Sequence, residues 1–269
     1  MSFRKAYIEP SVINRAQKCG LSGLKLKEMI EKHSFAPAVG LQAIYEMART
    51  FLNQDDLQLG TALFQIIWEL DPYYQMDAAM LHDQEIIKLR TGAAVFSSLA
   101  PINLTATRLI VGRLARGFLD DGYMNFIAVR EAEIRENHPN FALGYIEETK
   151  GTTSKRFPTF ESFYIELADQ IPDLIYQSVK GKVTISEAHE IYHRIGSFPA
   201  IRSTVRSNIY LCWICVNHQN IPKKDKYDDY RHIIEASYCD IFVTDDKQLS
   251  NTAPRINPDI EVLKGRQFF

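Results

Sequence analysis

Five acidic side chains of this sequence lie directly after predicted strands or inside short predicted helices. They are Glu9, Glu46, Asp229, Asp245 and Asp246. Hard divalent cations take oxygen ligands, and metal ions that bridge a phosphate activate a water and stabilise the leaving oxygen. We expect these acids to be metal ligands, directly or through water, with Asp245 as the alternative to Asp246 and Asp228 as the alternative to Asp229. The residue types predict a site for a hard divalent cation such as Mg²⁺ or Mn²⁺, which could bind a phosphate.

The elements that must position these acids lie at the two ends of the chain. β-prone runs cover residues 5–9, 35–39, 240–246 and 260–263, and helical periodicity dominates between about 53 and 217. This alternation predicts an α/β fold, a single domain with a parallel sheet formed by about 1–52 and 218–269, with a helical insertion of about 53–217. Ligands of open parallel sheets bind beyond the carboxyl ends of the strands. We therefore expect the acids to share one crevice.

A different interpretation of the same acids is that they cap helices or lie in solvated turns. Asp228, for example, is a plausible N-cap for a helix that begins at Asp229.

The segment 251–258 contains Asn251 and two prolines and is expected to be a turn.

Four motifs of the chain resemble those of the PIN-domain nucleases. They are Tyr7–Val12, Pro37–Arg49, Asp229–Ala236 and Cys239–Leu249. The resemblance covers about residues 4–50 and 225–269. It implies a PIN-like fold and a metal-dependent ribonuclease in which Glu9, Glu46, Asp229 and Asp246 hold the metal and the Thr244 hydroxyl orients a carboxylate or a water. Glu9 stands where the family usually has an aspartate, so a catalytically weak scaffold that binds RNA or a protein partner is the alternative.

An RNA substrate requires cationic and polar side chains beside such a pocket, with lysines on the flanking phosphates. The side chains that we expect to contact substrate are Ser11, His232, Lys223, Lys224, Lys226, Arg202 and Arg206. A predicted helix with Arg108, Arg113 and Arg116 is a further candidate. The pattern leaves open that the lysines only form a solvated loop and that His232 only packs within the fold.

Two shorter motifs indicate other chemistry. His189, Glu190 and His193 fit a zinc-protease helix, with Glu235 as the candidate third ligand, and predict a zinc metallopeptidase as a second alternative. Thr184 and Glu187 predict a capping box at the start of that helix. Cys212 and Cys215 form a CxxC pattern, with His218 and Cys239 nearby, that is more typical of a buried apolar segment than of a zinc or redox site.

Composition limits the remaining function classes. The 269 residues carry a net charge of −2, so an anionic substrate must be attracted by a local basic patch. No apolar run approaches the roughly 20 residues of a membrane span. The first residues resemble a strand more than a signal peptide, and four scattered cysteines are typical of a reducing compartment, so we expect a cytoplasmic protein.

Overall fold

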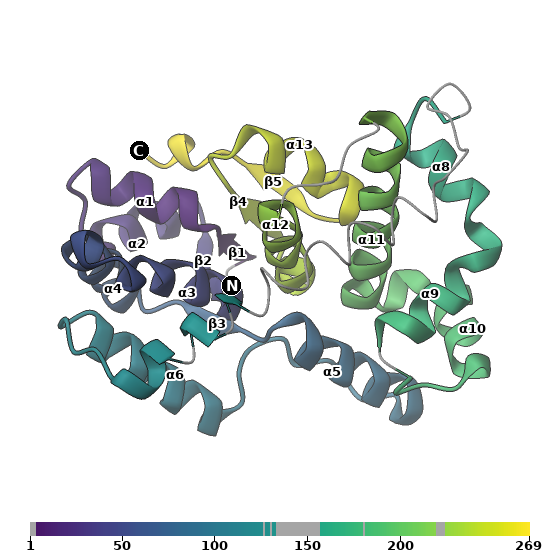
Figure 1. The fold of residues 1–269 in the computed structure, drawn as a ribbon, viewed down its shortest axis with the longest axis horizontal. Helices are drawn as coiled ribbons and strands as arrows, with labels where there is room; N and C mark the ends of the chain where they lie inside the picture. Colours follow the sequence, from purple (N-terminus) through teal and green to yellow (C-terminus); the bar gives the residue numbers. More distant parts are fainter. Residues whose placement is uncertain (1–3, 126, 130, 133–156, 180, 219–223) are drawn as a thin grey trace.

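The computed structural model describes residues 4–125, 127–129, 131–132, 157–179, 181–218 and 224–269. Its strands are β1 (Arg4–Ile8), β2 (Phe35–Gly40), β3 (Tyr73–Gln75), β4 (Ile241–Val243) and β5 (Glu261–Leu263). In this part of the chain they form one five-stranded sheet in the order β3-β2-β1-β4-β5, and all neighbouring strands pair in parallel (Figure 1). The α/β class is therefore confirmed.

The strands alternate their side chains between two hydrophobic cores. Ala6, Ile8 and Val243 point into one core, and Tyr7 and Phe242 point into the other. Because successive strand residues face opposite sides of a sheet, this alternation makes a sheet that is covered on both faces. The result is a layer of helices, a parallel sheet and a second layer of helices (Figure 1).

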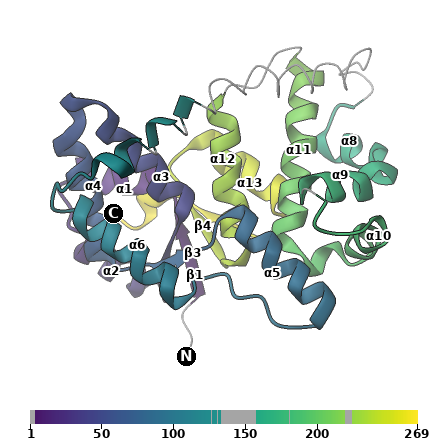
Figure 2. The ribbon, with the colours of Figure 1, turned by 60° about the horizontal axis from the view of Figure 1, so that its bottom comes forward.

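The helices divide between these two cores. Those that contribute to the first core are α1 (Pro10–Lys18), α2 (Gly23–Lys32), α3 (Leu41–Ala48), α4 (Leu57–Leu70) and α6 (Pro101–Leu114). The helix α5 (Ala78–Thr91) contributes to both cores. The helices that contribute mainly to the second core are α8 (Phe160–Glu166), α9 (Ile171–Ser178), α10 (Ile185–His193), α11 (Pro199–His218), α12 (Lys224–Glu235) and α13 (Lys247–Ile256). Figure 2 shows α10 at the far edge of this second group, away from the sheet.

Local signals fix where the helices next to the strand ends begin. Pro10 occupies the first turn of α1, where a missing N–H costs nothing, and the Glu9 side chain caps this helix through the Ser11 N–H. Asp246 caps α13 by accepting the Leu249 N–H. Two of the acids at the carboxyl ends of the strands are thus also helix caps, and this fixes the backbone around them.

The expected boundary of the helical insertion is wrong at its start. Residues 73–75 were not expected to be a strand, yet β3 pairs with β2, and α4 packs against α1 and α2. The sheet domain therefore extends past residue 52 to at least residue 75. Three residues are too few to show the alternation by which a strand is recognised.

Two predicted local structures near the carboxyl terminus are also wrong. The expected turn at 251–258 is mostly helix, because Asp246 caps α13 and its apolar residues face the second core, including Leu249, Ala253 and Ile256. The helix expected to begin at Asp229 begins at Lys224 instead, so Asp228 lies inside α12 and is not its N-cap. None of the described helices has the length and apolar character needed to cross a membrane.

Candidate functional site

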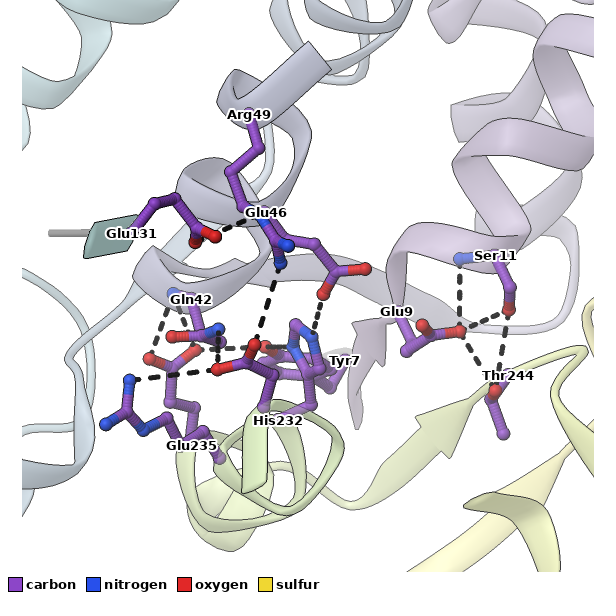
Figure 3. Close-up of polar contacts among 12 residues, drawn as sticks. Tyr7, Glu9, Ser11, Gln42, Glu46, Arg49, Glu131, His232, Glu235 and Thr244 are labelled. Atoms are coloured by element: carbon purple, nitrogen blue, oxygen red, sulfur yellow. Dashed lines mark hydrogen bonds and ion pairs between the residues drawn. The ribbon is translucent and has the colours of Figure 1, made fainter. Parts of the chain in front are cut away.

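Glu9 lies at the carboxyl edge of the sheet, where β1 and β4 end side by side. Ile8 pairs with Val243, and the Glu9 N–H donates to the Val243 carbonyl at 3.0 Å. The Glu9 side chain is 7% exposed and accepts bonds from the Thr244 Oγ1 at 2.9 Å, from the Ser11 N–H at 3.1 Å and from the Ser11 hydroxyl, all on Oε2 (Figure 3). Glu9 is therefore held in one orientation by both strand ends.

The two hydroxyls beside Glu9 also organise the turn that follows β4. Ser11 Oγ accepts the Asp245 N–H at 2.9 Å, and Thr244 Oγ1 accepts the Asp246 N–H at 3.0 Å. Each hydroxyl has one proton, which it donates to Glu9, and each accepts one backbone N–H. Ser11 and Thr244 thus connect Glu9 to the segment that carries Asp245 and Asp246.

Glu46 enters the same region from α3 and meets His232 from α12. The Glu46 carboxylate bonds to His232 Nε2 at 2.8 Å, His232 Nδ1 lies 3.0 Å from the Tyr7 hydroxyl, and that hydroxyl donates to Glu235 Oε2 at 3.0 Å (Figure 3). Glu235 also accepts the Gln42 N–H at the start of α3, at 3.0 Å. This buried chain joins the strand β1, the helix α3 and the helix α12.

The charges of this cluster shift each other's pKa values. Burial lowers the pKa of His232, but the bond to Glu46 and the charges of Glu46, Glu9 and Glu235 outweigh burial and raise it to about 9. His232 is then an imidazolium that donates from both nitrogens, to Glu46 and to Tyr7. Burial raises the pKa of Glu46, but bonding to His232 more than offsets this, so its pKa is lowered.

Two other carboxyls of the cluster have raised pKa values. Burial raises the pKa of Glu9; His232 and the Ser11 and Thr244 hydroxyls oppose the rise, and Glu46 adds to it. Burial raises the pKa of Glu235 to about 8, against the opposing charge of His232. His232 lowers the pKa of both Glu9 and Glu46, so the two acids lie near the same imidazole although they come from different elements (Figure 3).

Asp228, the predicted alternative to Asp229, is buried between α12 and α3. It is 5% exposed, accepts a bond from the Gln42 side chain at 3.3 Å and lies 3.6 Å from Arg49 Nη1. Arg49 in turn bonds to Glu131 at 3.0 Å. Asp228 therefore stabilises the packing of α12 on α3, and its role as a metal ligand is not supported.

Asp229 lies within the electrostatic influence of Asp246. Burial raises the pKa of Asp229, Lys226 lowers it through a contact of 2.9 Å, and Asp246 raises it. Asp245, the predicted alternative to Asp246, instead pairs with Arg15 at 3.0 Å and accepts the Arg266 N–H at 3.1 Å. Of the two neighbours, Asp246 belongs with the other acids.

The four remaining acids share one pattern. Within the described residues each is bonded through one oxygen only: Glu9 and Glu46 through Oε2, Asp229 through Oδ2 and Asp246 through Oδ1. Figure 3 shows the second oxygens of Glu9 and Glu46 facing the space between the two side chains. Such oxygens fit the donor chemistry of Mg²⁺ or Mn²⁺. However, no group of three or more His, Cys, Asp or Glu among the described residues is arranged closely enough to hold an ion.

Arg202 and Arg206, which we expected to contact RNA, are structural residues of α11. Both are at most 9% exposed. Arg202 bonds to Asp259 at 2.5 Å, and Arg206 bonds to Glu161 and to the Arg255 carbonyl, each at 2.6 Å. These partners lie near the carboxyl end of α13, whereas Asp246 caps its amino end. The positive charges of both arginines are therefore satisfied inside the fold and away from the acids.

The other expected contacts with substrate have mixed outcomes. Lys226 lies beside the acids, but its charge is engaged by Asp229. Lys223 and the side chain of Lys224 lie outside the described part of the chain. His232 is 1% exposed, so it is not positioned to contact a substrate and instead holds Glu46 from inside the fold.

The helix α6 lies on the other face of the sheet. Two of its arginines are exposed and paired, Arg108 with Asp71 at 2.9 Å and Arg113 with Asp120 at 3.5 Å. Arg116, in the turn after the helix, lies over the Phe118 ring, with its guanidinium carbon 5.9 Å from the ring centroid. These arginines have local partners and do not belong to the acidic region.

The zinc interpretation is not supported by the fold. The predicted capping box of Thr184 and Glu187 is present at the start of α10. His189 and His193 lie exposed on this helix, whereas Glu235 is buried against Tyr7 beneath the acids. The proposed third ligand is therefore not beside the histidines.

The CxxC pattern lies inside α11, as a buried apolar segment. Cys212 and Cys215 are buried free thiols, and Cys239 is a third. Among the described residues they belong to no metal-binding group. The side chain of His218 lies outside the described part of the chain.

Sequence reasoning missed Tyr7 and Gln42, which hold the charged cluster together. Tyr7 carries a signal of its own, because a tyrosine in the middle of a buried strand must find a partner for its hydroxyl. The partners themselves, His232 and Glu235, are 225 and 228 residues away in the sequence.

Comparisons with protein-family models, with curated proteins and with solved structures found no match.

Proposed function

We propose that this chain is a Mg²⁺- or Mn²⁺-dependent nuclease of PIN-like fold that hydrolyses RNA. The observation that carries the proposal is the gathering of Glu9, Glu46, Asp229 and Asp246 at the carboxyl edge of a parallel sheet, each with one oxygen unbonded within the described residues. This is the edge at which ligands of such sheets bind. It is also the order of acids on which the resemblance to PIN-domain nucleases depends.

Glu9 and Glu46 would hold the cation, with Asp229 and Asp246 as ligands directly or through water, and the bound cation would supply charge neutralisation for a phosphate and an activated water. The protein's own groups have defined tasks around it. Ser11 and Thr244 keep one Glu9 oxygen occupied and so direct the other toward Glu46. His232 orients Glu46 through one nitrogen and is itself held by Tyr7 through the other.

A cleavage assay tests the proposal. Labelled single-stranded RNA is incubated with the protein in Mn²⁺, in Mg²⁺ and in EDTA, and the Glu46→Gln and Asp246→Asn variants are compared with Glu261→Gln, an exposed acid on the edge strand β5. Loss of several kcal/mol of charge stabilisation corresponds to a rate loss on the order of 100-fold or more. We expect that loss in EDTA and in the first two variants only. Cleavage that survives Asp246→Asn contradicts the assignment.

A second candidate function is a catalytically weak scaffold that binds RNA. The observation that favours it is that protein cations already offset two of the acids, since His232 pairs with Glu46 and Lys226 pairs with Asp229. In the same assay this candidate gives RNA binding without cleavage in either metal. A scaffold also predicts that Glu46→Gln leaves RNA affinity unchanged in Mn²⁺.

A further inference from the structure

A hollow in the surface opens directly beside the acidic cluster. It has a volume of about 930 Å³, near the upper end of the range of roughly 300–1,000 Å³ for ligand pockets. Ser11, Thr244 and Asp246 line the end that it shares with the acids. A molecule that lies in this hollow therefore contacts Asp246 and the two hydroxyls that hold Glu9.

Five of the other side chains that line the hollow are cationic, and they come from three parts of the chain. They are Arg15, Lys18, Lys247, Lys264 and Arg266, and we call this set the basic groove. The first two residues lie on α1, Lys247 begins α13, and the last two follow β5. These segments meet because β1, β4 and β5 are parallel neighbours, so that whatever follows each strand emerges at the same edge of the sheet.

Most of the charge of the basic groove is uncompensated. Arg15 pairs with Asp245 at 3.0 Å, whereas the other four cations form no ion pair within the described residues. The two carboxylates that line the hollow, Asp245 and Asp246, do not balance five cations. Like charges held close together repel, and a bound polyanion relieves that repulsion. The chain carries a net charge of −2, so this concentration of positive charge is local.

We propose that the basic groove binds the phosphates of an RNA strand that runs from the acidic cluster toward the end of the chain. The inference rests on the proposed function, and it assigns the substrate path to residues other than the expected arginines of α11. Cations spread along a hollow suit a strand with one negative charge per nucleotide, because each lysine then meets a separate phosphate. Asp246 marks the end at which the scissile phosphate lies.

The test measures binding in EDTA, so that cleavage plays no part. The affinity of a fluorescein-labelled single-stranded RNA is determined by fluorescence anisotropy at several NaCl concentrations. The Lys247→Gln/Lys264→Gln double variant is compared with Lys32→Gln, an exposed lysine at the end of α2, next to the start of β2 and thus at the opposite edge of the sheet. Thermal unfolding of all three proteins checks that the exposed substitutions leave the fold intact.

Each lost phosphate contact lowers the slope of log affinity against log salt by about 0.7 for a single strand, so we expect a decrease of about 1.4 in the double variant. The same relation predicts an affinity loss on the order of 10- to 30-fold at 0.1 M salt. Lys32→Gln should bind as the unmodified protein does. In a cleavage assay, the double variant should raise KM and leave kcat unchanged, as expected for lost substrate binding.

The outcomes separate the two proposals. RNA binding that depends on the basic groove, without cleavage in any metal, contradicts the nuclease assignment and leaves the groove intact. If the double variant has the RNA affinity and the salt slope of the unmodified protein, the basic groove does not bind RNA, whatever the cleavage result. Binding of poly-glutamate as tight as that of RNA also overturns it, because the groove would then favour acidic polypeptides.

Discussion

Gly40 provides a sharp test of how α3 and α12 are joined. It ends β2 and precedes α3, and a methyl group added to it would overlap Glu235 Oε2 and would lie 2.5 Å from the Tyr7 hydroxyl oxygen. The Gly40→Ala substitution must therefore push Glu235 away from Tyr7 and from the Gln42 N–H. Since Glu235 and His232 lie on the same helix, the change also disturbs the support of Glu46.

The size of the effect follows from these contacts. Overpacking a dense site costs about 1–3 kcal/mol. A buried polar group left without its partner costs a further ~1–3 kcal/mol. Gly40 has a φ of −85°, which alanine adopts readily, so reduced entropy of the unfolded chain returns about 0.4–1 kcal/mol. We expect Gly40→Ala to lower the free energy of unfolding by about 1–5 kcal/mol.

Urea denaturation followed by circular dichroism measures this difference. The control is Gly196→Ala, because nothing in the described part of the chain lies within 4 Å of the added methyl group. That variant should be within about 1 kcal/mol of the unmodified protein. If Gly40→Ala is as stable as Gly196→Ala, Glu235 does not lie against the start of α3, and the arrangement of the charged cluster is refuted.

Three further predictions concern buried polar groups. Tyr7→Phe removes the hydroxyl that joins His232 to Glu235 and should lower the free energy of unfolding by about 2–3 kcal/mol in urea, whereas Tyr73→Phe at an exposed position should have little effect. Burial raises the pKa of Glu85 to about 7, above its ordinary value, so its stabilising contribution is complete below about pH 4.5 and is lost as the pH rises through 7. Tm should therefore fall between pH 5 and pH 8 more steeply in the unmodified protein than in Glu85→Gln. Equal slopes would contradict the raised pKa of Glu85. Arg206→Ala removes the donor to the Arg255 carbonyl and should lower the free energy of unfolding by about 1–3 kcal/mol, without changing RNA affinity in EDTA. A loss of RNA affinity in the folded variant would show that Arg206 contacts the substrate.

The sequence was sufficient to predict the strands that carry the acids. The runs that became β1, β2 and β4 are apolar, β-prone and bounded by proline, glycine or aspartate, and these local signals are enough to place Glu9 and Asp246 at strand ends. The helix α4 lies where helical periodicity was expected, because its apolar pattern is strong.

Other features depend on contacts that no local pattern contains. The segment around Asn251 resembles a turn, but the capping of α13 by Asp246 and the burial of its apolar side against α11 and α12 stabilise a helix that includes Pro254. Arg202 and Arg206 were expected on the surface. The helix that carries them is buried on opposite sides, with Ile201 and Val205 on one and Tyr210 on the other. A helix of this kind lies in the interior and keeps its arginines there only when they are paired.

The charged cluster was predicted only in part, for the same reason. The types of its acids are evident in the sequence, but the neutralisation of Glu46 by His232 requires α3 and α12 to be neighbours, across a separation of 186 residues. The basic groove was not expected at all, because its members come from three separate segments. Charged side chains on such segments are usually solvated. Only the position of the three segments at one edge of the sheet brings their cations into the same hollow.

The most direct test of the central claim is anomalous diffraction from crystals of the protein soaked in Mn²⁺. The account predicts a manganese peak within about 2.5 Å of the unbonded oxygens of Glu9 and Glu46, with Asp229 and Asp246 coordinating directly or through water. The Glu46→Gln variant should lose this peak. A peak at His189 and His193, or no peak at the carboxyl edge of the sheet in crystals whose buffer holds millimolar manganese, would contradict the proposed metal site.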